Sequence, residues 1–150
     1  PWVDAWLNRQ RASTGMPVVL NDAHLLRAVV RRLRDGMLLA ILPDVRSRRG
    51  GIAVSFLNGT AWWGGGAALF ARLTGAPIFP AILVREGWTR HRLRVWEPIR
   101  PDLNLEKEKD IERMTRLLAD VLSRAILDAP EQYFWYNRRW VLEPFSATPS

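Results

Sequence analysis

The sequence predicts an α/β fold with a central mixed, largely parallel sheet that is flanked by helices. The apolar run of residues 37–42 (MLLAIL) contains no polar residue, which indicates a strand covered on both faces. It follows an amphipathic helical segment and precedes a second strand-like run, Ile52–Phe56, and such alternation of helix and strand is typical of a parallel sheet. Ligands of these sheets bind beyond the carboxyl ends of the strands, so we expect the functional edge at Asp44 and the basic loop that follows it.

The N-terminal part is predicted to contain two helices and a strand before that run. Residues 1–14 are predicted as a short helix, and residues 16–20 (MPVVL) as a strand. The next helix has one apolar face and ends at Gly36. Its other face carries Arg27, Arg31, Arg32 and Arg34. Together with the strand at residues 37–42 this order predicts a right-handed crossover unit.

The C-terminal part begins with a turn at residues 57–60, after which residues 62–66 (WWGGG) are predicted to open a helix that Gly75 closes. The remaining predicted elements are a hairpin of residues 76–84 and 91–96, an amphipathic helix over residues 106–128 and an aromatic segment from Pro130. No repeat or linker divides the sequence, so we expect residues 1–150 to form a single partial domain. Because the chain starts at Pro1 and not at Met, we expect it to be a fragment or a piece of a longer protein.

Composition narrows the classes of function. The net charge is +7, and only Lys107 and Lys109 of the 22 basic residues are lysines. Arginine binds phosphate and carboxylate bidentately, although a genome rich in G and C would also enrich it. The absence of cysteine excludes disulfides and a thiolate nucleophile. No nucleic-acid motif accompanies the arginines, and no apolar run approaches the ~20 residues that span a bilayer. Eight tryptophans suit either a core or an apolar interface.

Asp44 is the first candidate for a site residue. The neighbouring Arg48 and Arg49 would keep its carboxylate ionised, and it could orient a catalytic residue, a substrate hydroxyl or another arginine. It could equally cap a turn. The loop with Gly50 and Gly51 could bind phosphate, because glycine allows close backbone approach, or it could be a solvated basic loop.

Other candidates are less specific. The glycines of residues 62–66 could expose backbone N–H groups to an anion, but we favour tight packing of a helix against the sheet. His24 and His91 have no partners that suggest a triad or a metal site, and we expect both on the surface. The C-terminal stretch around Arg138 and Arg139 alternates aromatic and basic residues, which fits a structural plug as well as a binding site.

Several motifs together resemble the lipid A biosynthesis acyltransferases of the late, secondary (lauroyl/myristoyl) type. They are the strand ending in Pro-Asp at Asp44, the Arg-Gly-Gly that follows, the stretch ARLTGAPIFP at residues 71–80, and APEQYFW leading to RRW at residues 129–140. The resemblance spans nearly the whole chain and corresponds to the C-terminal half of the family's catalytic domain.

The resemblance implies a glycerol-phosphate-acyltransferase-like fold and the transfer of a fatty acyl group to a hydroxyl of a lipid A precursor or a related glycolipid. The acyl donor would be acyl carrier protein, or alternatively acyl-coenzyme A, with no cofactor and no metal. The partners would be the carrier protein and anionic membrane lipid, not nucleic acid. The protein would work at the cytoplasmic face of the bacterial inner membrane, with an anchor upstream of Pro1.

The family's catalytic signature, His-x-x-x-x-Asp/Glu, is missing from residues 1–150, because Val29 and Trp96 stand at the acidic position after the two histidines. We therefore expect the general-base histidine upstream and the chain alone to be inactive. Asp44 matches the aspartate of an Asp-Gln motif, with Val45 in place of glutamine. The family's required arginine falls near Arg11.

Further substrate-binding positions implied by the resemblance or by charge are Arg9, Arg48, Arg49, Arg138 and Arg139. The segment of residues 75–80 resembles a block that shapes the acyl and acceptor pocket. The alternative hypothesis is a non-catalytic module with the same fold that binds anionic lipid or polyanions. A third is an acyltransferase for another acceptor.

Overall fold

The computed structural model describes residues 2–15, 25–45, 47 and 50–135. The chain divides into two compact units, Pro1–Leu39 and Ala40–Ser150, which are considered separately below. The prediction of a single partial domain stays a prediction.

The first unit contains the two predicted helices, α1 (Trp2–Ser13) and α2 (Leu25–Arg34). Val29 on the apolar face of α2 is buried, which confirms the amphipathic pattern. The helix ends at Arg34 and is closed by Gly36, whose φ of 81° suits glycine. The N–H of Met37 donates to the carbonyl of Arg32 at 3.0 Å. The strand predicted at residues 16–20 lies outside the described residues.

The strand predicted at residues 37–42 is not present in the structure. These residues are extended without a strand partner, and Leu38 and Leu42 are 94% and 83% exposed. An apolar run can form a strand only where another strand completes its hydrogen bonds, and none does so among the described residues. The predicted crossover unit is therefore not formed in the described part of the chain.

In the second unit, β1 (Ile52–Phe56) and β2 (Gly59–Trp63) form an antiparallel hairpin in which Ile52 pairs with Trp63. The prediction that residues 62–66 open a helix is thus wrong for the two tryptophans, which belong to β2. The turn residues Leu57 and Asn58 have φ of 49° and 63°, as a two-residue hairpin turn requires. The N–H of Leu57 donates to Ser123 Oγ at 2.8 Å, so a distant helix supports this costly conformation.

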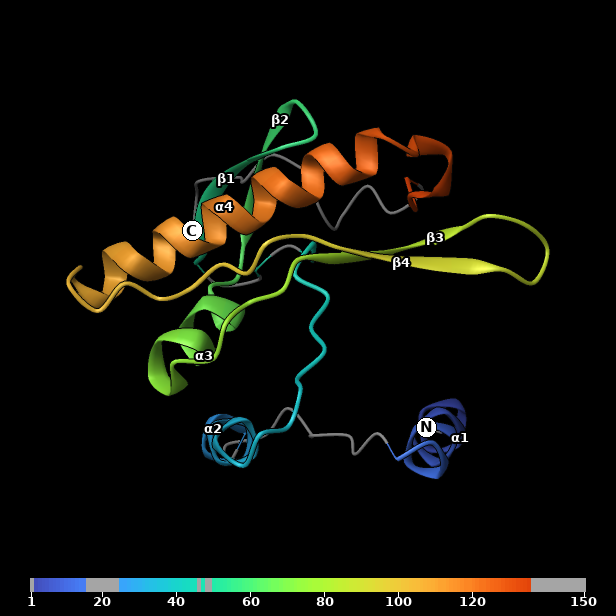
Figure 1. Cartoon of the computed structure of the whole chain (residues 1–150), viewed down its shortest axis with the longest axis horizontal. Coiled ribbons are helices and arrows are strands. Elements are labelled where there is room, and N and C mark those ends of the chain that lie inside the picture. The colour runs from blue at the N-terminus through green and yellow to red at the C-terminus, as the bar shows by residue number, and fades with distance from the viewer. Residues whose placement is uncertain (1, 16–24, 46, 48–49, 136–150) are drawn as a thin grey trace, which may run out of the picture. The chain divides into compact units, whose positions relative to one another are not determined.

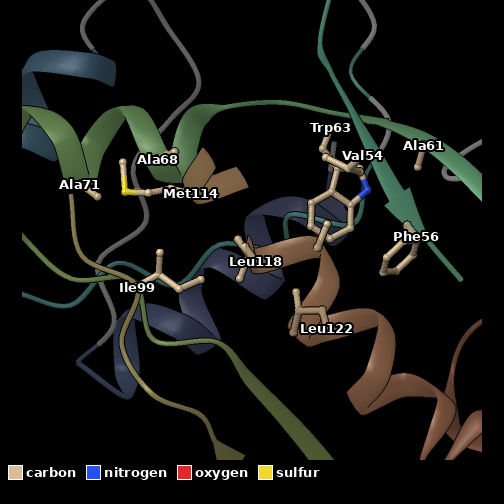
Figure 2. Close-up of a cluster of buried hydrophobic side chains, with 11 residues drawn as sticks. Val54, Phe56, Ala61, Trp63, Ala68, Ala71, Ile99, Met114, Leu118 and Leu122 are labelled. Carbon is tan, nitrogen blue, oxygen red and sulfur yellow. The ribbon is translucent and has the colours of Figure 1, made fainter. Parts of the chain in front are cut away.

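The two remaining helices are α3 (Gly66–Thr74) and α4 (Lys107–Leu127), which agree with the predicted helices, including the end of α3 at Gly75. The core lies where α4 packs against the β1–β2 hairpin and α3. Figure 2 shows Phe56 and Trp63 of the hairpin opposite Leu118 and Leu122 of α4. The rings of Phe56 and Trp63 are 4.9 Å apart in an edge contact.

Tight packing explains one of the three glycines at the start of α3. A Cβ on Gly65 would lie 2.9 Å from Ile111 Cγ2 and 3.1 Å from Ile52 Cδ1, so a side chain there would force the core apart. Gly64 and Gly66 have open space around them. The packing interpretation is confirmed for Gly65.

The predicted second hairpin is also present, as β3 (Ala81–Arg85) and β4 (His91–Val95). Its base continues into a single bridge between Ile78 and Ile99. The sequence predicted one solvent-exposed face for β4, but all five of its residues are exposed.

The α/β class is confirmed as a mixture of helices and small sheets. Both sheets of the described residues have two antiparallel strands. The central parallel sheet and the glycerol-phosphate-acyltransferase-like architecture stay predictions.

Buried charges attach the loop before α4 to the rest of the second unit. Asp110 has no exposed surface, and Arg113 donates to its Oδ1 through Nη2 at 2.6 Å and through Nε at 3.0 Å. Arg72 of α3 lies 3.5 Å from its Oδ2 and also donates to the carbonyls of Asp102 and Leu105. Each charge of this network is therefore matched by an opposite charge or by a backbone dipole.

Candidate functional site

Asp44 lies at the end of the extended segment of residues 40–44 and is joined to the C-terminal part of the second unit. The phenol Oη of Tyr133 donates a hydrogen bond to Asp44 Oδ2 at 3.1 Å. The two residues are 89 positions apart in the sequence. The Pro-Asp motif and the Pro-Glu-Gln-Tyr motif, singled out separately in the sequence, therefore meet in one place.

Aromatic rings hold Tyr133 at this position. It follows a single 3-10 turn, η1 (Pro130–Gln132), and its ring makes edge contacts with Phe56 at 6.4 Å and with Trp135 at 5.1 Å. Trp135 in turn donates its indole N–H to the carbonyl of Pro130 at 2.6 Å. The phenol ring is thus packed against the core while its hydroxyl faces the carboxylate.

Gln132 attaches the same turn to the β3–β4 hairpin. Its Oε1 accepts from the N–H of Arg85 at 2.7 Å, and its Nε2 donates to the carbonyl of Arg85 at 3.2 Å. The side-chain amide therefore satisfies both backbone groups of the last residue of β3, as a neighbouring strand would. Gln132 and Tyr133 give the turn two attachments, one to the hairpin and one to Asp44.

The electrostatics of the pair fix its protonation. Burial, then the negative charge of Asp44 and the hydrogen bond to it, raise the pKa of Tyr133 above its usual value. The phenol is therefore neutral at physiological pH and acts as a donor. A carboxylate has room for about four hydrogen bonds, so a single phenol occupies only part of the capacity of Asp44.

The loop after Asp44 folds back onto β2. The N–H of Ser47 donates to the carbonyl of Trp62 at 2.9 Å. A Cβ on Gly51 would lie 3.1 Å from Ser47 Cβ and 3.2 Å from the carbonyl oxygen of Trp63, and Gly50 has a φ of 60°. The two glycines thus allow the backbone conformation and the close packing that the loop requires. Phosphate binding by this loop stays a prediction, because Arg48 and Arg49 lie outside the described residues.

The other predicted site residues are distributed as follows. Arg9 and Arg11 are exposed on α1, which belongs to the first unit, whereas Asp44 belongs to the second. Arg138, Arg139 and His24 lie outside the described residues. His91 is exposed on β4, as expected of a surface histidine. The site roles of Arg9, Arg11, Arg138 and Arg139 therefore stay predictions.

Sequence reasoning missed Tyr133 as the partner of Asp44 and Gln132 as its support. The signal available was the unusual run Glu131-Gln132-Tyr133, which was interpreted as either a plug or a binding site. The structure shows Tyr133 packed on the core and bonded to Asp44, and a binding role for the segment stays a prediction.

Two further observations concern metal ligands and membrane-spanning helices. Within the described ranges, no three His, Asp or Glu side chains are grouped so as to hold a metal ion. Among the helices of those same ranges, none is both long enough and apolar enough to cross a membrane.

Comparison with known protein families identifies a match over most of the chain. Residues 1–141 match the family model described as "Bacterial lipid A biosynthesis acyltransferase". A search of curated proteins finds no match.

Proposed function

Because the chain belongs to the bacterial lipid A biosynthesis acyltransferase family, we propose that it forms part of an enzyme that transfers a fatty acyl group to a hydroxyl of a lipid A precursor or a related glycolipid. Family membership supports a lipid A acyltransferase-type activity in general. The observation that supports a site at Asp44 is its hydrogen bond with Tyr133.

In this proposal Asp44 orients a group that takes part in the reaction, and Tyr133 holds the carboxylate in place. A histidine outside residues 1–150 takes the proton of the acceptor hydroxyl, whose oxygen attacks the thioester carbon of the donor while the carrier thiol leaves. Arg11, with Arg9 as its neighbour, binds a phosphate of donor or acceptor, as Arg48, Arg49, Arg138 and Arg139 also do.

The charge of the chain supports the choice of partners. A net charge of +7 suits an acidic acyl carrier protein as donor and an anionic membrane as the place of reaction. Acyl-coenzyme A, which is also anionic, is the second donor to assay. No cofactor is required, because the acyl thioester is a co-substrate. The cytoplasmic face of the inner membrane is the proposed location.

The test replaces Asp44 with asparagine in the polypeptide that includes the upstream sequence. Asp44→Asn keeps the size of the side chain and its bond from Tyr133 but removes the charge. We expect the rate of acyl transfer to fall by about 10²-fold or more, which is the low end of the range for loss of general acid–base catalysis. The unfolding midpoint should not change. Asp120→Asn, on the solvent side of α4, is the matched control and should retain full activity.

Two outcomes would count against the proposal. Wild-type turnover by folded Asp44→Asn would remove Asp44 from the site. The second outcome is the absence of acyl transfer by the longer wild-type polypeptide with either donor and several acceptors. That result would favour the alternative hypothesis, a non-catalytic module that binds anionic lipid. Residues 1–150 alone should be inactive in the same assay.

A further inference from the structure

The β3–β4 hairpin has two different faces, which follow from its register. Leu83 pairs with Leu93, and Ala81 pairs with Val95, so these four apolar side chains share one face. Leu83 and Leu93 are 64% and 63% exposed, and the other two residues are exposed as well. The opposite face carries Val84, which is buried. The hairpin thus has an inner face toward the core and an outer apolar face open to solvent.

The tip of the hairpin adds an aromatic side chain to this apolar face. Trp88, in the turn between the strands, is 97% exposed. Figure 1 shows the hairpin as a long ribbon that extends beyond the end of α4 in the second unit. A fully exposed tryptophan at the end of an exposed apolar strip costs hydration free energy unless something covers it.

Basic residues outnumber acidic ones in the hairpin. Residues 81–95 contain four arginines and one glutamate, and Glu86 is paired with Arg90 and Arg92. Arg85 and His91 pair across the strands on the outer face, at the tip end of the apolar strip. A cleft of about 570 Å³ lies there, lined by Leu83, Arg85, His91, Glu131 and Gln132. The apolar strip therefore ends at a polar cleft in which Arg85 and His91 lie with Glu131.

We propose that the outer face of the β3–β4 hairpin, with Trp88 at its tip, docks onto an anionic phospholipid bilayer. Tryptophan prefers the interfacial zone of a bilayer, and the leucines and valine of the strip reach the acyl boundary beside it. The arginines then lie at headgroup level, where they attract anionic lipid, and the cleft at Arg85 and His91 receives a headgroup phosphate.

A bilayer fits these observations better than a protein partner does. The strip is narrow, one pair of strands wide. At its tip end Arg85 lies on the same face and Arg90 in the adjoining turn, and their charge complements a surface of phosphates. The choice of occupant rests on the proposed function, because the acceptor of such an enzyme is a lipid. Vesicle binding and acyl transfer are measured separately, so each can fail without the other.

The test is flotation of the full 150-residue chain with two kinds of vesicle. One kind contains phosphatidylcholine alone. The other also contains about 30% phosphatidylglycerol, roughly the anionic fraction that gives inner leaflets their negative surface potential. Wild type should float with the anionic vesicles, and less so as salt rises. The double variant Trp88→Ala/Leu93→Ser should lose at least tenfold in affinity. Arg85→Gln/Arg90→Gln should lose more than tenfold, about fivefold for each arginine.

The matched control removes a leucine and an arginine elsewhere in the second unit. Leu103 is 73% exposed in the loop before α4, and Arg100 is exposed beside it. Leu103→Ser/Arg100→Gln should float like wild type. Equal loss in this control would overturn the proposal, as would unchanged flotation of folded Trp88→Ala/Leu93→Ser or equal binding of wild type to the neutral vesicles.

A second measurement reports directly on depth. Brominated lipids quench tryptophans that enter the interface, so the quenching seen with wild type should be reduced in Trp88→Phe. If quenching is the same in Trp88→Phe and in wild type, the hairpin tip does not enter the bilayer and the proposal fails. In detergent-dispersed substrate, the hairpin variants of the longer polypeptide should keep acyl transfer, which separates docking from chemistry.

Discussion

Asp110 and Asp44 are two carboxylates of the same unit with opposite environments. Asp110 is fully buried, bound by Arg113 and approached by Arg72, and its Oδ2 also accepts the N–H of Asp102 at 3.1 Å. Asp44 is half-buried, and its bond from Tyr133 comes from a neutral donor. The first carboxylate is saturated by charges of the protein, whereas the described residues supply the second with a neutral donor that occupies part of its acceptor capacity.

The difference separates a structural carboxylate from a candidate functional one. A saturated buried ion pair cannot bind a substrate without losing partners that it needs, and removal of one partner leaves an uncompensated charge. A carboxylate held by one phenol is positioned without being neutralised. The location of Asp44 at the end of a loop-forming segment, next to glycines, is also where ligand groups can approach.

The largest expected effect is on the buried network. Asp110→Ala leaves Arg72 and Arg113 without their carboxylate, so we expect a loss of about 3–5 kcal/mol in the free energy of unfolding, measured with urea. Asp120→Ala removes a carboxylate from an exposed pair with Arg124 and should cost about 0.5 kcal/mol or less. A loss below about 1 kcal/mol in Asp110→Ala would mean that the network is not structural.

An intermediate effect is expected at Tyr133. Tyr133→Phe keeps the edge contacts with Phe56 and Trp135 but removes the hydroxyl, so stability should fall by only about 1 kcal/mol. If the phenol positions Asp44, kcat of the longer polypeptide should fall by more than this stability change explains, while KM changes little. Trp135→Phe, which loses a hydrogen bond to a backbone carbonyl, should leave kcat unchanged. An equal fall of kcat in both variants would assign Tyr133 a purely structural role.

The smallest effect is a change with pH. The pKa of Tyr133 is higher in the folded chain than in the unfolded chain, where it is about 10. The folded state thus binds this proton more tightly, so its contribution is complete below about pH 10 and is lost as pH rises toward the folded value. The free energy of unfolding of wild type should fall between about pH 9.5 and 11 more steeply than that of Tyr133→Phe.

Elements with a strong local pattern were predictable. The period of Met114, Leu118 and Leu122 predicted α4 and its buried face, and the glycine after Thr74 predicted the end of α3. The β3–β4 hairpin was predictable because turn residues separate two apolar runs.

Features that depend on a distant partner were not predictable. The run of residues 37–42 has the composition of a buried strand, but periodicity does not show whether another strand lies beside it. Trp62 and Trp63 precede three glycines and looked like the start of a helix, whereas their pairing with β1 makes them strand. No local sequence pattern indicates the ion pair of Asp110 with Arg72 or the hydrogen bond from Tyr133 to Asp44, because the partners are 38 and 89 positions apart.

The support of the β1–β2 turn by Ser123 has a consequence for the synthesis of the chain. Leu57 and its helical partner are 66 positions apart, so the hairpin leaves the ribosome long before the helix that covers it. During that interval the apolar sides of Phe56 and Trp63 have no cover from α4. At about 5–20 residues per second, the interval lasts several seconds, which is long enough for a chaperone to bind the nascent hairpin.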